Sequence, residues 1–241
     1  MNAIEIRNLT KKYKDVTAVD DLSLDIREGE LFSLLGINGA GKTTTIKILT
    51  CLASQTSGEA MLLGKSITKE PGEVKRVIGI SPQETAVAPN LTVLENLRLM
   101  CGAHGLSKAK AQEKTEELIQ EFSLTEILNK RASRLSGGWQ RRLSIAMALV
   151  GEPKILFLDE PTLGLDVIAR SELWRTIRAL KSKATIILTT HYMEEAESLS
   201  DRIGIMKGGR LIALGTADEI KAKANKERFE DAFIALAGGE G

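Results

Sequence analysis

Long apolar runs, cysteines and excess charge of one sign are all scarce in this sequence. No uninterrupted apolar stretch in the 241 residues approaches the roughly 18 to 20 that a membrane-crossing helix needs, so no transmembrane segment is expected. The formal net charge of +1 gives no global basic field, so no nucleic acid partner is expected. Cys51 and Cys101 lack metal-ligand spacing and indicate packing residues in a reducing compartment. The segment 1–7 lacks the basic-then-apolar order of a signal peptide, so a cytosolic chain is expected.

What is present is an ordinary globular composition. Hydrophobic residues make up 43% of the chain and charged residues 27%, a balance that argues against disorder. The length suits one large domain, or a core with a subsidiary lobe.

The most specific stretch is the glycine-rich segment 36–43, Gly-Ile-Asn-Gly-Ala-Gly-Lys-Thr. It follows the apolar run 31–35 and leads into a plausible helix over 44–49, the strand–loop–helix setting of a P-loop. Backbone N–H groups of such a loop surround a phosphate, Lys42 contacts the β- and γ-phosphates, and the Thr43 hydroxyl binds Mg²⁺. An ordinary glycine turn with a surface lysine is the weaker alternative. The sequence therefore predicts a nucleoside triphosphate site.

Two adjacent carboxylates, Asp159 and Glu160, follow the apolar run 155–158. Such a run is typical of a strand buried on both faces of a parallel sheet. Neighbouring strand side chains point to opposite sides, so we expect Asp159 to reach Mg²⁺ and Glu160 to face the attacking water. The alternative is a strand end that releases two charges to solvent.

Gln83 and His191 each lie just beyond another apolar, strand-like run. A lone histidine is more often a satisfied polar residue than a catalytic one. However, the carboxyl ends of parallel strands share one edge of a sheet, where open α/β sheets bind ligands. We therefore expect Gln83 and His191 to gather around the phosphates with the P-loop, and His191 to contact the γ-phosphate.

The character of the chain changes from β to α over about 92–131, which predicts an inserted helical lobe. Thr92 with Glu95 three residues later forms a capping-box pattern. Ser136-Gly137-Gly138 then precedes an apolar helical run and offers a second anion cradle at a helix start. Arg141 and Arg142 are interpreted as a solvated face without a function.

Near the N-terminus, a polar loop over 11–15 is expected between two half-buried strands. It carries Tyr13, which is a packing residue or a face on which a purine base stacks.

In combination these motifs resemble the ATP-binding cassette (ABC) family over essentially the whole chain. The matching segments occur in the family's order: Tyr13, Gly36–Thr43, Gln83, Leu135–Gln140, Ile155–Glu160, Leu165-Asp166 and His191. The resemblance implies an α/β fold: a P-loop NTPase (RecA-like) core with an N-terminal antiparallel β part and an inserted α-helical lobe. Its expected divisions are 1–84 and 152–225 for the nucleotide-binding core, 85–151 for the helical signature lobe, and 226–241 for a C-terminal helix and tail.

The resemblance also implies a site for ATP and Mg²⁺ built from two copies of the chain. Catalysis is expected from Glu160 as general base with His191 and Lys42. Direct ATP contacts are expected from Tyr13, Val19, Gly36, Asn38, Gly39, Ala40, Gly41, Lys42, Thr43, Thr44 and Gln83. Mg²⁺ is expected at Thr43, Gln83 and Asp159. Ser136, Gly137 and Gly138 would act in trans on the partner's ATP, and Asp166 would lie at the dimer interface.

Trp139 departs from the family pattern, which has glutamine at the fifth signature position. Its bulk changes the contact expected across the dimer. Thr44-Thr45, Gly164–Asp166 and Phe229–Phe233 resemble the export-type, multidrug-resistance-like branch.

The expected function is the ATPase subunit of a membrane exporter. The expected partners are a second ATP-binding subunit, head to tail, and membrane-spanning permease subunits, with a groove for the latter beside Gln83 and the helical lobe. The chain would therefore lie at the cytoplasmic face of the membrane. Two alternatives stay open: a soluble cassette ATPase outside transport, for example in iron–sulfur assembly, and a nucleotide-sensing regulator without turnover.

Overall fold

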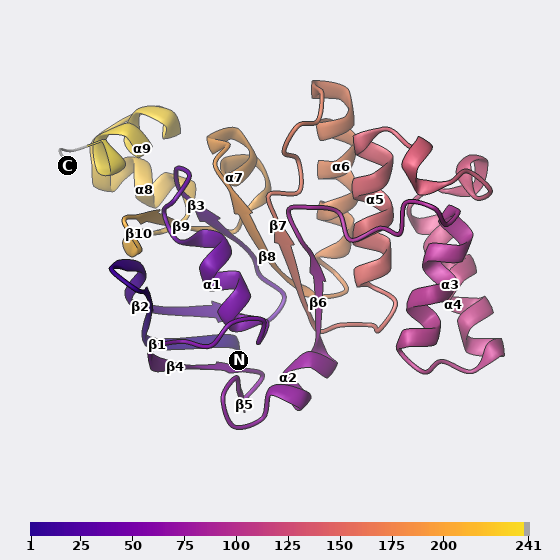
Figure 1. Cartoon of the computed structure of the whole chain (residues 1–241). Coiled ribbons are helices and arrows are strands. Elements are labelled where there is room, and N and C mark those ends of the chain that lie inside the picture. The colour runs from indigo at the N-terminus through magenta and orange to yellow at the C-terminus, as the bar shows by residue number, and fades with distance from the viewer. Residues whose placement is uncertain (239–241) are drawn as a thin grey trace.

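The computed structural model describes residues 1–238, and the strands within them form two sheets (Figure 1). The larger sheet has six strands in the order β10-β9-β3-β8-β7-β6. All neighbouring pairs in it are parallel except the edge pair β9–β10. The bounds are β3 Leu31–Leu35, β6 Ile78–Ser81, β7 Ile155–Asp159, β8 Thr185–Thr190, β9 Arg202–Lys207 and β10 Arg210–Gly215.

The strands β3, β7 and β8 in the middle of this sheet are buried at every residue. Short apolar runs predict such strands, because helices or a second sheet cover both faces. The P-loop begins directly after β3, and β3 lies between β9 and β8. The position of the P-loop is therefore set by the middle of the sheet. The expected α/β core is confirmed.

The smaller sheet is antiparallel, in the order β2-β1-β4-β5. Its strands are β1 Asn2–Tyr13, β2 Val16–Arg27, β4 Ser57–Leu62 and β5 Lys65–Ser66. The loop expected over 11–15 was wrong, because β1 continues to Tyr13 and pairs it with Val16. Lys14 has φ 49°, and this left-handed residue allows a two-residue hairpin turn.

Helix α1 (Lys42–Leu49) packs between the two sheets. One hydrophobic cluster joins Ile46, Ile48 and Leu49 of this helix to the antiparallel sheet and to one face of the parallel sheet. Helix α2 (Pro71–Val77) adds Val74 to the same cluster. The second turn of α1 is therefore held from both sides.

The helices on the other face of the parallel sheet form a second cluster. They are α3 Val93–Ala103, α4 Lys108–Glu121, α5 Gly137–Ala148 and α6 Val167–Leu180, with 3₁₀ turns at Thr125–Ile127 and Ala132–Arg134. Thr92 and Glu95 form both bonds of the predicted capping box. Figure 1 shows α3 and α4 standing away from the sheet, with α5 and α6 nearer to it. The division of the chain at 85 and 151 stays a prediction.

The C-terminal part packs around β9 and β10 as a third cluster. It contains α7 Met193–Leu199, α8 Ala217–Ala224 and α9 Phe229–Ala237. The expected glycine-rich tail lies outside the described residues from 239 onward. Within residues 1–238, no helix combines the length and the apolar character that crossing a membrane requires.

Candidate active site

The P-loop needs glycine at two positions because main chain from other strands lies against it. A Cβ on Gly36 would lie 2.5 Å from the Met206 carbonyl oxygen of β9, and one on Gly41 would lie 2.3 Å from the Ala18 oxygen of β2. Gly41 also has φ 101°, a conformation that side chains rarely adopt. It is the N-cap of α1 and supplies no side-chain cap, so backbone N–H groups at this helix end have no side-chain acceptor.

Lys42, the first residue of α1, is only 5% exposed. Its Nζ donates to the Gly36 carbonyl at 2.6 Å and to the Ile37 carbonyl at 3.3 Å. It also lies 3.3 Å from Glu160 Oε1. The ammonium is therefore held inside the loop by main-chain oxygens and one carboxylate.

Thr43 joins the P-loop helix to the end of β7. Its Oγ1 donates to Asp159 Oδ1 at 3.1 Å. The hydroxyl of Thr189, on β8, donates to the same Asp159 oxygen. Helix α1 and strands β7 and β8 thus place two hydroxyl groups and one buried carboxylate together.

The Glu160 carboxylate lies between two nitrogen atoms. Oε1 faces Lys42 Nζ, and Oε2 lies 2.7 Å from His191 Nδ1. A carboxylate only accepts, so Nδ1 carries the proton and donates. The side chain is 5% exposed, so water reaches this carboxylate only at its edge.

The two carboxylates were expected to point to opposite sides because side chains alternate along a strand. That reason was wrong, because Glu160 is not part of the strand. The strand ends at Asp159, and Glu160 has φ 49° in the left-handed region. The Thr189 carbonyl and hydroxyl both accept from the Glu160 N–H, at 3.1 and 3.0 Å. As a result both carboxylates contact the start of α1, one through Lys42 and one through Thr43.

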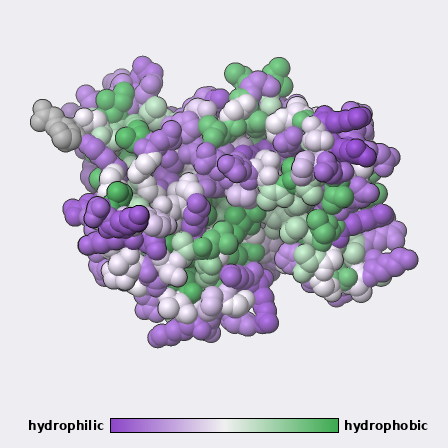
Figure 2. All heavy atoms as spheres, in the orientation of Figure 1, coloured by the Kyte–Doolittle hydropathy of each residue, from purple (hydrophilic) through white to green (hydrophobic). Residues whose placement is uncertain are grey.

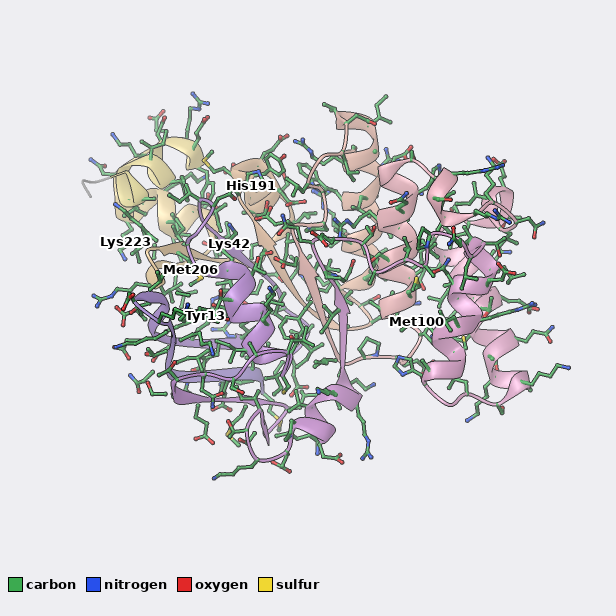
Figure 3. All side chains as sticks on the ribbon, in the orientation of Figure 1. Tyr13, Lys42, Met100, His191, Met206 and Lys223 are labelled. Atoms are coloured by element: carbon green, nitrogen blue, oxygen red, sulfur yellow. The ribbon has the colours of Figure 1, made fainter. Side chains whose placement is uncertain are left out.

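Ten of the predicted residues line one cavity of about 770 Å³, and two more, Gly36 and Asp159, lie beside it through their bonds to Lys42 and Thr43. Those lining it are Asn38, Gly39, Ala40, Gly41, Lys42, Thr43, Thr44, Gln83, Glu160 and His191. Figure 3 shows Lys42 and His191 on the side of the molecule that carries the P-loop. Further lining residues were missed from the sequence: Val16, Thr17, Ala18, Leu163 and Gly208. They come from a hairpin, one loop and a turn whose positions depend on packing.

Two predicted base contacts do not line this cavity. Tyr13 is half-exposed, with Lys11 Nζ 4.7 Å from the centre of its ring. It pairs with Val16, which does line the cavity, so it lies close to the edge. Val19 is fully buried in the core between the sheets.

Arg141 was wrongly interpreted as solvated. It is 5% exposed, and its guanidinium donates to the Pro82 and Gln83 carbonyls, each at 2.6 Å. The apolar periodicity of the sequence did not predict this burial, because α5 packs against the sheet as well as against other helices. Its neighbour Arg142 pairs with Glu172 at 2.7 Å and lies over the Trp139 ring.

The predicted in-trans segment lies outside the cavity of this single chain. Ser136 is the exposed N-cap of α5 and makes no side-chain cap bond. Gly137 and Gly138 pack beside Leu165 and Ala169. Asp166 caps α6, with Oδ1 accepting from the Ala169 N–H at 2.9 Å.

The chemistry of these donors fits a nucleotide with a hard cation. Glycines exclude side chains from the loop, a buried ammonium supplies positive charge, and Thr43 with Asp159 offers oxygen ligands. Oxygen ligands are those that Mg²⁺ prefers, and it usually completes its shell with phosphate oxygens and water.

A parallel sheet with this loop and acid pair defines a P-loop nucleoside triphosphatase. The family model for ABC transporters matches residues 19–163. The chain is 42% identical over 239 residues to a probable multidrug ABC transporter ATP-binding protein, YbhF, of Escherichia coli (strain K12), covering 97% of this chain and 41% of that protein. It is 43% identical over 221 residues to the daunorubicin/doxorubicin resistance ATP-binding protein DrrA of Streptomyces peucetius, covering 91% and 67%.

Solved structures agree. An ATP-binding subunit of an ABC transporter superposes with a TM-score of 0.86 at 31% identity, covering 97% of this chain and 99% of that one. The ATP-binding cassette MJ0796, solved as a dimer in a post-hydrolysis state with ADP and Pi, gives 0.80 at 28% identity, covering 88% and 98%. The chain belongs to the ABC transporter family, and its fold is that of the family's ATP-binding subunit.

Proposed function

We propose that this chain binds ATP with Mg²⁺, hydrolyses it and powers a membrane exporter. The observation that carries the proposal is the Glu160 carboxylate held between Lys42 and His191 in the cavity that the P-loop lines. ATP fits because loop N–H groups and Lys42 offer positive partners to its phosphates.

Each residue has a separate task in this proposal. Lys42 exchanges the Gly36 and Ile37 carbonyls for phosphate oxygens and stabilises the charge that grows on them. Glu160 accepts a proton from the attacking water. His191 donates from Nδ1 to Glu160, which fixes its ring, and in the doubly protonated imidazolium form Nε2–H also donates to the γ-phosphate. Mg²⁺, when bound at Thr43, Asp159 and Gln83, neutralises charge on the phosphate oxygens.

The working unit is a head-to-tail dimer with two ATP molecules. Ser136, Gly137 and Gly138 of one copy complete the site of the other, and Asp166 lies at their interface. The uncapped, exposed start of α5 supports this arrangement, since its N–H groups suit an anion from another chain.

Export is supported by the relatives, whose names refer to multidrug transport and to daunorubicin resistance. This chain spans about two fifths of the length of the first of them. We therefore place the substrate among drug-like molecules, carried by membrane-spanning subunits, with this chain at the cytoplasmic face. No feature of the described residues favours an iron–sulfur assembly role or a sensor without turnover.

Glu160→Gln tests the proposal. Glutamine keeps the size and one acceptor but is not a base, so turnover should fall by about 10²- to 10⁴-fold while ATP binding persists. Gel filtration with Mg-ATP should then show a trapped dimer. Lys42→Ala is the opposite control, because it should lose ATP binding. Wild-type turnover in Glu160→Gln would exclude Glu160 as the base.

A further inference from the structure

One face of helix α5 packs against β6 and contacts the segment that follows β6. A Cβ on Gly79 would lie 2.3 Å from the Ala148 carbonyl oxygen, so strand and helix backbones are in contact there. About one turn earlier on α5, the buried hydroxyl groups of Ser144 and Ser81 bond at 2.9 Å.

The third connection, at the N-terminal end of that face, is Arg141. Residues 141, 144 and 148 share one helix face by their spacing. The guanidinium fork donates to two successive carbonyls, those of Pro82 and Gln83. A planar fork can fix two oxygens at once, which an ammonium does poorly.

The burial of this arginine requires compensation. Removal from water lowers the pKa of the Arg141 guanidinium, and the charges of Asp159 and Glu195 oppose that effect. No carboxylate of the described residues forms an ion pair with Arg141 at bonding distance, so the two carbonyls take its closest hydrogen bonds. In some proteins a buried charge is retained at such a cost because it fixes a geometry.

We infer that Arg141 is a positioning residue that fixes the Pro82–Gln83 main chain against the start of α5. The Gln83 side chain is exposed and lines the cavity, whereas its own carbonyl is anchored. Arg141 lies five residues after Ser136, the cap of the same helix. One side chain therefore sets both the position of Gln83 at the nucleotide and its distance from Ser136–Gly138. This rests on the proposed function for the role of Gln83 only.

The first test needs no nucleotide. Glu84, next to Gln83, is exposed and is a cleavage site for a glutamate-specific protease. In Arg141→Lys and Arg141→Gln, release of the fragment 1–84 should be about tenfold faster, because the segment opens more often. Arg178→Gln is the matched control: Arg178 also donates to a main-chain carbonyl, that of Ser198 at 3.0 Å, but from an exposed position of α6. It should cleave at the wild-type rate.

The second test is a double-mutant cycle on turnover of Mg-ATP. Arg141→Lys keeps the charge beside Asp159 and Glu195 and should lower kcat about tenfold with the melting temperature kept. In a Gln83→Ala background the same change should cost less than about twofold, because the side chain that it positions is gone.

Cleavage at Glu84 at the wild-type rate in both Arg141 variants would overturn the inference. So would a double variant whose fold-loss in kcat equals the product of the losses of the two single variants. If Arg141→Gln does not fold, Arg141→Lys decides. A wild-type chain without ATPase activity would instead contradict the proposed function, and the cleavage assay would still decide on Arg141.

Discussion

Glu195 is a carboxyl group buried in α7 near the active site. It is fully inaccessible, and only Oε1 has a hydrogen-bond partner within the described part of the chain, the Trp174 indole N–H at 3.0 Å. Burial raises the pKa of Glu195, and the charge of Glu160 adds to this, while nearby hydroxyls of Thr190 and Thr162 oppose it. An isolated negative charge here is costly, so the folded state retains the proton to higher pH.

This makes stability depend on pH in a defined direction. Above about pH 4.3, where an unfolded glutamate ionises, the folded chain binds more protons at Glu195 than the unfolded chain does. The free energy of unfolding therefore falls as pH rises, until the pH passes the raised folded pKa. Glu195→Gln removes this loss, so its melting temperature relative to wild type should increase across that window and then level.

Melting curves between pH 4 and 9 provide the measurement. Glu194→Gln, the exposed neighbour, is the control and should keep a constant difference from wild type. A constant difference for Glu195→Gln as well would mean that Glu195 ionises normally.

At the scale of elements, local sequence patterns predicted most strands and helices. The helices that were not predicted, α2 and α8, carry start signals that were overlooked. Helix α8 begins with Thr216 and Glu219, which form the same capping box as Thr92 and Glu95. Helix α2 has Pro71 in its first turn, where proline is favoured. Both are short, seven and eight residues, so their apolar periodicity gave little information.

Asp166 has an element-scale role that is separable from its proposed role at the dimer interface. Its carboxylate caps α6, so Asp166→Ala should lower the free energy of unfolding by about 1 kcal/mol. Asp166→Asn keeps an acceptor oxygen and should be as stable as wild type. Denaturant titration measures both, and equal stability of all three chains would mean that the cap contributes nothing.

At the scale of the whole molecule, the helices α3 and α4 stand apart from the core. Figure 2 shows green, hydrophobic surface between the core and the helices α3 and α4. Continuous apolar surface of this kind marks interaction sites. The family resemblance predicts a permease groove beside Gln83 and the helical lobe, and apolar surface next to α3 and α4 supports that prediction.

We therefore expect the chain to be captured with a membrane-spanning partner. A tagged chain expressed in its own cells should co-purify with a multi-span protein from detergent-solubilised membranes, and an untagged chain is the control. The capture should persist in Lys42→Ala, because Lys42 is buried inside the P-loop and is not part of the proposed groove. A chain recovered without any membrane protein would contradict the exporter proposal.

The sequence by itself determined the class of protein and the central chemistry. The P-loop over 36–43 and the pair Asp159-Glu160 could be predicted because each is a local pattern whose setting, a buried strand end, is also local. Convergence of Gln83 and His191 on that site followed from one topological rule, that parallel strands end at a common edge.

Only the tertiary structure decided which side chains are buried and paired. The turn at Glu160, the cavity wall at Val16–Ala18 and the anchoring of Gln83 by Arg141 all depend on elements far apart in the chain. A charged residue on an amphipathic helix is expected in water, and it becomes a buried anchor only because β6 lies against that face. Burial is a property of the packed pair of elements, and neither sequence segment carries it alone.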